Sequence, residues 1–323
     1  MNIQIHIADS FCGHYMPFIL FRECFFSILS HYYKDDTSVS VSYVNDLTEL
    51  SKDSIILLNM YDLTLWERSE ETRHLLTTSA STFIIVNTEH WETRGAKEVF
   101  ELITNKKLSN VILIEYNIIN QRNIASQYPS INSLFLPLIY NKSLENYYRT
   151  YVVNKISWQD KDIDVLFYGG LNDRRRKVID KLTNHKLHIV DSHNGVSNME
   201  LCNLIERSKI VINVLYYDFN IIFDYYRNTM LLANNALLIT ETPQEIDDNI
   251  EYWLEDMNSC MVTTSYDNLV ECVELYLAKE TSEINDVLQR QHHWFKQTDM
   301  ADILVPFFEY YQLQGTFPSS STS

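Results

Sequence analysis

The feature that most constrains the fold is a repeated alternation of short apolar runs with longer helix-like stretches. The apolar runs are rich in β-branched residues, as strands are, and the stretches between them repeat apolar residues at helical spacing. Strands that alternate with helices form parallel sheets, because each helix carries the chain back to the start of the next strand. The first series of strand-like runs comprises residues 2–8, 38–44, 54–60, 82–88, 110–115 and 133–138, with helices predicted at 15–33, 65–78, 96–104 and 118–127.

A second series of the same kind follows residues 140–161, a polar and aromatic segment without a clear strand that we interpret as a connection between domains. Two α/β units of this size predict two Rossmann-like doubly wound parallel-sheet domains facing a cleft. The strand-like runs are 163–168, 187–191, 210–215, 236–240 and 260–263, with helices at 171–183, 198–207, 224–233 and 266–278. The expected organisation is an N-terminal domain at 1–150, a C-terminal domain at 151–280, further helices at 281–314 and a Ser-rich, disordered tail at 315–323.

The charge of the chain restricts its partners. A formal net charge of -17 argues against nucleic acid or an anionic membrane as the main partner, although peripheral contact with a membrane stays open. The sequence contains no apolar run of the ~20 residues that a membrane span needs, and Met1 leads directly into a strand pattern. Five scattered cysteines without CxxC spacing indicate a reducing compartment. We therefore expect a cytoplasmic protein.

The most informative turn joins the strand at 163–168 to the next helix. Only six glycines occur in the chain, and two of them, Gly169 and Gly170, are adjacent here. Glycine permits positive φ and close approach of a ligand to the backbone, and the helix N-terminus that follows favours an anion. Arg174 and Arg175 could add bidentate contacts to phosphate. The alternative is a tight turn followed by a solvated basic helix face.

Two further stretches in the second half could contact a nucleotide. The loop at 190–196 contains His193 and Asn194, and its backbone could read the edge of a nucleobase, although many such loops are simply turns. Asp224 and Arg227 lie three residues apart near the start of a predicted helix, and so share a face. An acidic residue there can hold a ribose hydroxyl and an arginine can meet a phosphate. A surface ion pair is the alternative.

The runs "DIDVLFYGGLNDRRRKVIDKL", "ERSKIVINVLYY" and "FDYYRNTMLLANNALLITE" together resemble the donor half of family-1-like bacterial and viral glycosyltransferases of the B type (GT-B). The resemblance covers residues 162–241, with fainter echoes in "IVNTEHW" and "LPLIY". It implies the GT-B architecture and transfer of a sugar from a nucleoside-diphosphate sugar, a UDP-sugar before GDP- or dTDP-sugars, to a hydroxyl of a glycan or other acceptor. The residues it places around the donor are Gly169, Gly170, Asn172 and Arg174 at the diphosphate, and Tyr216, Tyr217, Asp224 and Arg227 in the pocket.

The chain departs from the family pattern in ways that bear on its chemistry. No Glu lies between Glu206 and Glu241, so the pair of glutamates found in many retaining members is absent. Leu215 replaces a common histidine, and Asp224 stands where the family has Glu. These differences tilt the expectation toward inversion of the sugar's stereochemistry. They also keep open a non-catalytic relative that binds nucleotides or glycans.

An inverting transferase needs a general base, which we expect in the first half, near the ends of its strands. His14 follows the first strand, and Glu89 and His90 follow the fourth. A histidine at either place could take the acceptor's proton near neutral pH, although each could equally be a surface or capping residue.

No metal or cofactor beyond the donor sugar nucleotide is predicted. The acidic letters at 160–164 precede their strand, and so would point to the wrong sheet edge for a divalent ion. HExxH, GxSxG and Walker patterns are missing, and no GxGxxG follows the first strand, which disfavours a nicotinamide oxidoreductase. His292 and His293 are adjacent on a predicted helix and would face apart.

Overall fold

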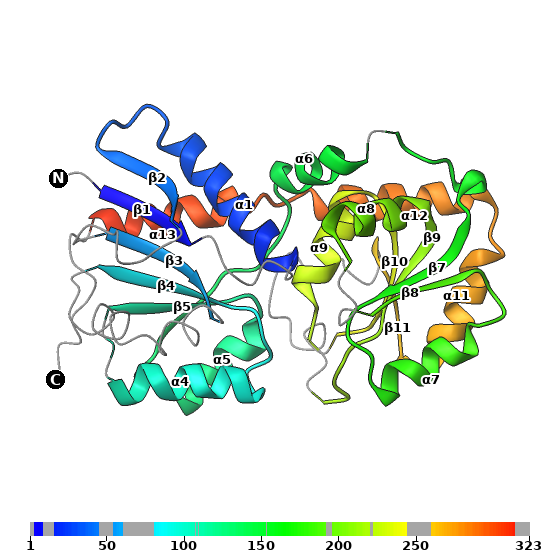
Figure 1. Ribbon diagram of the computed structural model, residues 1–323, viewed down its shortest axis with the longest axis horizontal. Coiled ribbons are helices and arrows are strands. Elements are labelled where there is room, and N and C mark those ends of the chain that lie inside the picture. Colours follow the sequence, from blue (N-terminus) through cyan, green and yellow to red (C-terminus); the bar gives the residue numbers. More distant parts are fainter. Residues whose placement is uncertain are drawn as a thin grey trace. The chain divides into compact units, whose positions relative to one another are not determined.

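The computed structural model describes residues 3–8, 16–44, 54–60, 81–106, 108, 110–152, 154–191, 196–219, 222–243 and 260–313. The chain forms two compact units (Figure 1). The first comprises Met1–Leu138 and Met300–Ser323, and the second Ile139–Asp299. The predicted helix at 65–78, the predicted tail and the candidates His14, His193 and Asn194 lie outside the described residues.

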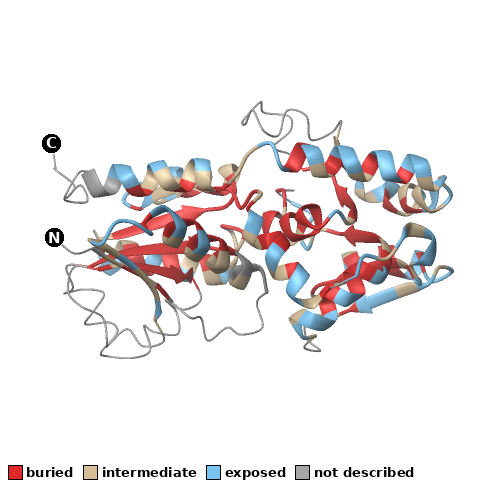
Figure 2. Ribbon diagram, turned by 90° about the horizontal axis from the view of Figure 1, so that it is seen from above, coloured by how far each residue is buried: buried red, intermediate tan, exposed pale blue. Residues whose placement is uncertain are grey.

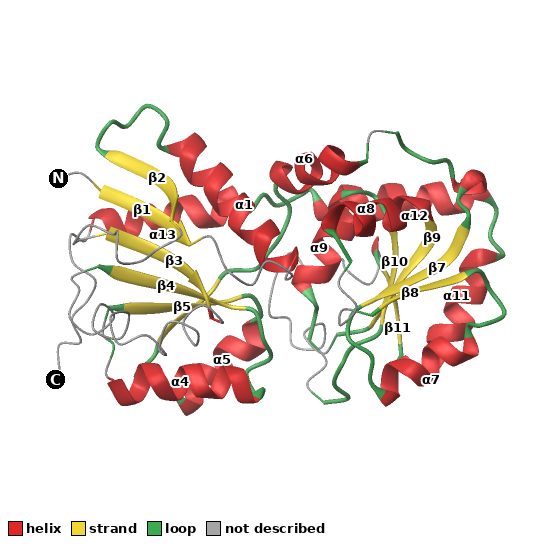
Figure 3. Ribbon diagram, viewed as in Figure 1, coloured by secondary structure: helices red, strands yellow, loops and turns green. Residues whose placement is uncertain are grey.

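The first unit is built on a parallel sheet whose strands lie in the order β2-β1-β3-β4-β5-β6. Its central strands are apolar and every residue of β4 and β5 is buried, as expected when helices cover both faces. Helices α4 and α5 pack on one face, and α1, whose crossover runs the other way along the sheet, covers the other (Figure 3). The elements are β1 (Ile3–Ala8), α1 (Met16–Tyr32), β2 (Val39–Val44), β3 (Ser54–Asn59), β4 (Thr82–Asn87), α4 (Arg94–Lys106), β5 (Val111–Glu115), α5 (Ile118–Gln127), β6 (Asn132–Phe135) and α13 (Ala301–Leu313).

The second unit contains a parallel sheet in the order β11-β10-β9-β7-β8. Its core joins the buried strands to the helices around them, and Figure 2 shows buried strands beneath helices with exposed outer faces. The elements are α6 (Lys142–Tyr151), η2 (Trp158–Asp160), β7 (Ile163–Tyr168), α7 (Asp173–Lys181), β8 (Leu187–Val190), α8 (Asn198–Arg207), β9 (Ser208–Asn213), α9 (Tyr225–Ala233), β10 (Leu237–Glu241), β11 (Val262–Thr264), η5 (Tyr266–Asn268), α11 (Leu269–Leu277) and α12 (Thr281–Phe295). The prediction of two doubly wound parallel-sheet units is confirmed.

The strand order of the second unit fixes where a ligand can bind. β8 lies on one side of β7, whereas β9, β10 and β11 extend the sheet on the other side. The chain leaves β7 toward one side of the sheet and leaves the adjacent β9 toward the other side, so the loops after these two strands diverge. The space between two such loops is the usual ligand site of an open α/β sheet. In this unit the corresponding position lies beyond the ends of β7 and β9, which Gly169 and Val214 follow directly.

The segment at 140–161, interpreted from the sequence as a connection, contains a helix. Asn141 caps the start of α6 by accepting a hydrogen bond from the backbone N–H of Ser143 at 2.9 Å. Leu144 and Tyr148 are buried, and the Tyr148 hydroxyl donates to the Cys202 carbonyl of α8 at 3.1 Å. The helix is therefore stabilised by packing against α8 within the second unit.

Candidate functional site

The predicted glycine turn has the conformation that requires glycine. Gly169 follows β7 with a φ of +134°, which side chains disfavour, and its N–H donates to the Val190 carbonyl at 2.9 Å. A Cβ on Gly169 would lie 2.8 Å from Nη2 of Arg227 and 3.3 Å from Nη1 of Arg175. The backbone is therefore closely approached by two guanidinium groups at the end of the central strand.

Arg175 and Arg227 are held beside the turn by uncharged acceptors. Arg175 is 3% exposed; its Nη1 donates to the Gly170 carbonyl at 2.6 Å and its Nε to the Val214 carbonyl at 2.8 Å. Arg227 donates from Nη1 to Oδ1 of Asn213 at 2.8 Å. Such partners fix the direction of each guanidinium without neutralising its positive charge.

The positive charge at this edge is incompletely neutralised. Burial, and then the nearby charge of Arg227, lower the pKa of Arg175 to about 9, so the group stays charged at neutral pH at an energetic cost. Asp224 is the opposing carboxylate, with Oδ2 3.6 Å from Nε of Arg227. Helices α7 and α9 also begin here, and helix N-termini carry positive partial charge. An anion bound at the turn would relieve this repulsion.

Asn172 and Tyr216 complete the cluster. Asn172 accepts from the Arg175 N–H through Oδ1 at 2.9 Å and donates from Nδ2 to the Tyr216 carbonyl at 2.7 Å. The guanidinium of Arg175 lies 5.0 Å from the centre of the Tyr216 ring, a cation–π contact. Tyr216 is 45% exposed and packs edge-on against Tyr217. An exposed aromatic ring beside the arginines offers a planar surface to the same ligand.

Arg174, predicted at the diphosphate, makes its contacts within the protein. Its guanidinium forms a two-point ion pair with Glu241, with Nη1 2.6 Å from Oε1, and also donates to the Leu215 carbonyl at 2.9 Å. The ring of Tyr266 lies 4.1 Å away. Arg174 thus ties α7 to the loops beyond β9 and β10, and its contact with a donor stays a prediction. The sequence did not reveal Glu241 as the partner of Arg174, although Glu241 directly follows the strand-like run at 236–240.

The structure therefore brings together, within the second unit, most of the predicted donor residues. Those gathered around the turn are Gly169, Gly170, Asn172, Arg174, Tyr216, Tyr217, Asp224 and Arg227. Arg175 joins them as the most buried of the arginines.

His90, the candidate base within the described residues, lies beyond the carboxyl end of β4 and is 5% exposed. Its Nδ1 accepts a hydrogen bond from the Glu92 N–H at 3.2 Å, so the neutral ring carries its proton on Nε2. Burial lowers the pKa of His90, which favours that neutral form. Accepting a proton through Nε2 would require the ring to change tautomer and give up the bond to Glu92.

Glu89 precedes His90 in a loop fixed by its backbone. The Glu89 N–H donates to Oδ1 of Asn87 at 2.9 Å, and its carbonyl accepts from Nδ2 of both Asn87 and Asn120. The end of β5 contributes Glu115, a fully buried acid that accepts from Asn87 at 2.9 Å. Burial raises the pKa of Glu115 well above its ordinary value, which favours the neutral carboxyl.

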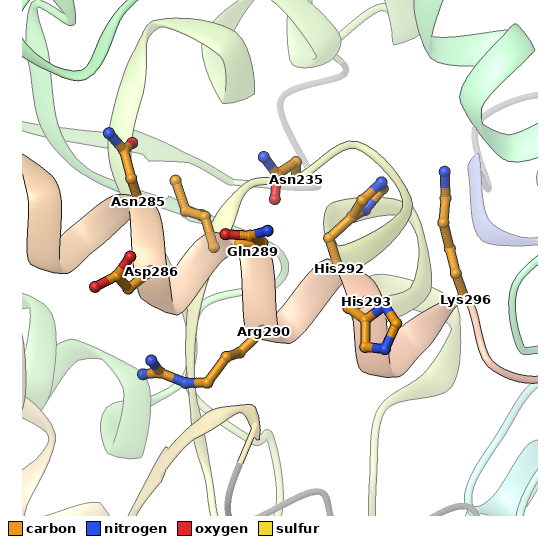
Figure 4. Close-up of a pocket in the computed structure, with 9 residues that line it drawn as sticks. Asn235, Asn285, Asp286, Gln289, Arg290, His292, His293 and Lys296 are labelled. Atoms are coloured by element: carbon orange, nitrogen blue, oxygen red, sulfur yellow. The ribbon is translucent and has the colours of Figure 1, made fainter.

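A hollow along α12 offers a less convincing site. Figure 4 shows Asn285 and His292 on the side of α12 that faces Asn235, whereas Arg290 points the other way. Asn235 lies in the turn before β10, at the edge opposite the glycine turn. Most of the side chains that line the hollow are exposed, as on a solvated helix face.

Two classes of feature are missing from the described part of the chain. It contains no group of three or more His, Cys, Asp or Glu side chains placed to share a metal ion. Among the same residues, no helix combines the length and apolar character that a membrane crossing requires.

No known family matches the sequence. The uncharacterized protein L138 of Acanthamoeba polyphaga mimivirus is 25% identical over 150 residues, a match that spans 46% of this chain and only 16% of that protein.

Solved structures resemble the chain over nearly its whole length. The N-terminal domain of trehalose-6-phosphate phosphatase from Candida albicans matches with a TM-score of 0.56 at 8% identity, over 96% of this chain and 97% of that one. The UDP-forming α,α-trehalose-phosphate synthase from Burkholderia vietnamiensis gives 0.54 at 8% identity, over 95% and 96%. An α-glucosyltransferase in complex with UDP and a DNA 13-mer gives 0.53 at 10% identity, over 97% and 99%. At this identity the likeness shows the fold, and the chain has the GT-B glycosyltransferase fold.

Replacing Gly169 with alanine should destabilise the second unit. The left-handed φ and the 2.8 Å approach to Arg227 together predict a loss of about 1–3 kcal/mol in the free energy of unfolding. The matched control is Gly170→Ala, because Gly169 is the described glycine with positive φ. Urea unfolding followed by circular dichroism measures both. Equal losses in the two variants would contradict a conformational role for Gly169.

Glu115→Gln should change how stability depends on pH. Burial raises the pKa of Glu115 well above its ordinary value in the folded state, whereas the unfolded carboxyl ionises near pH 4.5. The contribution of Glu115 to the free energy of unfolding is therefore most favourable below about pH 4.5. It decreases as the pH rises, because the unfolded carboxyl ionises first, and it is lost once the pH passes the folded pKa. The slope is at most about 1.4 kcal/mol per pH unit. Urea unfolding of both proteins between pH 5 and 8 should show wild type losing stability relative to Glu115→Gln. Parallel curves would mean that Glu115 is ionised.

Proposed function

We propose that the protein is a glycosyltransferase that moves a sugar from a nucleoside-diphosphate sugar to a hydroxyl group of a glycan or other acceptor. The observation that carries this proposal is the incompletely neutralised arginine pair, Arg175 and Arg227, against the Gly169 backbone at the ligand-binding edge of the second sheet. A diphosphate is the anion that matches two converging guanidinium groups and two helix N-termini. The GT-B fold and the resemblance of residues 162–241 agree with it.

The donor is assigned to the second unit. The diphosphate lies against Gly169 and Gly170, with Arg227 and Arg175 as its charged partners and Asn172 positioning the loop. Tyr216 and Tyr217 line the sugar side, and Asp224 takes a ribose or sugar hydroxyl. His193 and Asn194 remain the candidates for reading the nucleobase. A UDP-sugar is the first choice because UDP accompanies two of the similar structures in their names.

The reaction joins the acceptor oxygen to the anomeric carbon and breaks the bond from that carbon to the diphosphate. The leaving oxygen keeps the bonding electrons, and the arginines and helix N-termini stabilise its charge. The acceptor proton passes to a base in the first unit, for which His90 and His14 are the candidates and Glu89 is next. No metal is needed, because the protein supplies the positive charge. The charge of -17 weighs against a nucleic-acid acceptor.

The donor assignment predicts a contrast among arginines. Arg227→Ala should raise the dissociation constant for UDP about 10-fold or more, the scale of a lost charge-assisted hydrogen bond. Thermal-shift titration with UDP, GDP and dTDP in EDTA measures this, since a ligand at 100 times its dissociation constant adds about 2.7 kcal/mol. Arg176→Ala, exposed on the same helix as Arg175, should bind UDP normally.

Arg174→Ala separates positioning from direct contact. It should lower the melting temperature first, because it leaves Glu241 buried without its partner. The sequence-based prediction adds a loss of donor affinity of ~10-fold.

If none of the three nucleoside diphosphates shifts the melting temperature of the wild type at millimolar concentration, the donor assignment is wrong.

The base assignment predicts that either His90→Ala or His14→Ala lowers kcat ~10²-fold or more while donor affinity is kept. His188→Ala provides the control, because His188 is exposed on β8 of the second unit. Initial rates with a saturating UDP-sugar measure the effect. Wild-type turnover in both variants would exclude the two histidines and direct attention to Glu89 and Asp9. A protein that binds donor but transfers to no acceptor would be a non-catalytic relative.

A further inference from the structure

A buried polar cluster at the carboxyl edge of the first sheet takes no direct part in the proposed chemistry. Asn87 is the last residue of β4 and Glu115 the last of β5, and the two are paired in register. Both are completely buried, and Nδ2 of Asn87 donates to Oε2 of Glu115 at 2.9 Å. The cluster also includes Asn120 of α5, which is equally buried.

The cluster holds the backbone of the loop that follows β4. Asn87 bonds both sides of Glu89, accepting from its N–H at 2.9 Å and donating to its carbonyl at 2.9 Å. Asn120 donates to the same carbonyl at 3.1 Å and accepts from the Trp91 N–H at 3.4 Å. Two strands and a helix thus converge on the stretch that carries His90.

Glu115 is costly at this place, which points to a specific use. A carboxyl in the core is disfavoured by burial, which raises the pKa of Glu115 well above its ordinary value. An apolar residue would fill the same volume without that cost. Nδ2 of Asn87 donates to Oε2 of Glu115, and this bond restrains the Asn87 amide that contacts Glu89 on both sides.

We propose that Glu115 is a positioning residue, which fixes the backbone path of residues 88–91 through Asn87 and thereby places Glu89 and His90. The placing of the loop is a property of the first unit alone. Its effect on turnover rests on the proposed transferase function.

The test compares Glu115→Gln, which keeps the acceptor oxygen and the shape, with Glu115→Met, which keeps the volume and removes the acceptor. Amide hydrogen exchange at Glu89 and Trp91 should rise about 10-fold or more in Glu115→Met, because local opening becomes easier, and stay at the wild-type rate in Glu115→Gln. With a UDP-sugar, kcat should fall roughly 10-fold in Glu115→Met with the dissociation constant for UDP unchanged. Asn120→Ala provides a second route to the same loop if Glu115→Met fails to fold.

Asn110→Ala is the matched control, because Asn110 Nδ2 also holds a backbone carbonyl, that of Ser81 at 2.8 Å, but at the opposite edge of the same sheet. It should lose stability without faster exchange at Glu89 or lower kcat. Unchanged exchange in Glu115→Met, or equal loss in Glu115→Gln, would overturn the proposal. Faster exchange with unaltered kcat would overturn the link to turnover. A wild type that transfers no sugar yet shows the exchange pattern would refute the transferase and leave the placing of the loop standing.

Discussion

The ion pair between Arg174 and Glu241 is the interaction on which the geometry of the second unit's ligand edge depends. Glu241 is 2% exposed and accepts from Arg174 and, at 2.7 Å, from the Leu215 N–H. Through Arg174 the first turn of α7 is joined to the loops after β9 and β10 and to the Tyr266 ring. Breaking such a buried pair costs roughly 3–5 kcal/mol, because the remaining charge is left alone. The buried ion pair of this edge is thus made by Arg174, whereas Arg175 and Arg227 contact the Gly169 turn.

The two units solve the same architectural problem with different chemistry. Each must hold loops in place at the carboxyl edge of a parallel sheet, where strand hydrogen bonds no longer restrain the chain. The second unit uses charged groups and keeps a surplus of positive charge near Gly169. The first unit uses the amides of Asn87 and Asn120 with Glu115, a carboxyl whose pKa burial raises. The two carboxyl edges therefore differ in electrostatic character, with arginines at one and amides at the other.

The sequence is sufficient to predict the fold class and the glycine turn, because both follow from local patterns. Apolar strands recur with helical stretches between them, and paired glycines in a chain with only six are conspicuous. Which arginine faces the turn is not a local property. Arg174 and Arg175 are successive residues and so point about 100° apart on a helix. Their partners are Glu241 at the end of β10 and Val214 just after β9, and the sequence alone does not align these positions with α7.

In the first unit, the sequence could not reveal that Glu115 is buried, because its burial depends on a neighbouring strand. Glu115 ends an apolar run and looks like a residue entering solvent, yet it is completely buried beside Asn87 of the neighbouring strand. Only the register between β4 and β5 makes that pairing visible. Helix α6 was missed for a related reason, because Tyr148 gains its stability from α8, far along the chain.

The route of the chain also orders its synthesis. Helix α13 packs against α1 and belongs to the first unit. In the sequence, however, the whole second unit separates α13 from the other elements of the first unit. A ribosome therefore delivers every strand of the second unit before the helix that completes the first. The second unit can reach its native topology while the N-terminal sheet still exposes the surface that α13 covers. During synthesis the second unit can therefore finish folding before the first unit does. This is the reverse of the usual order, in which the N-terminal domain folds first.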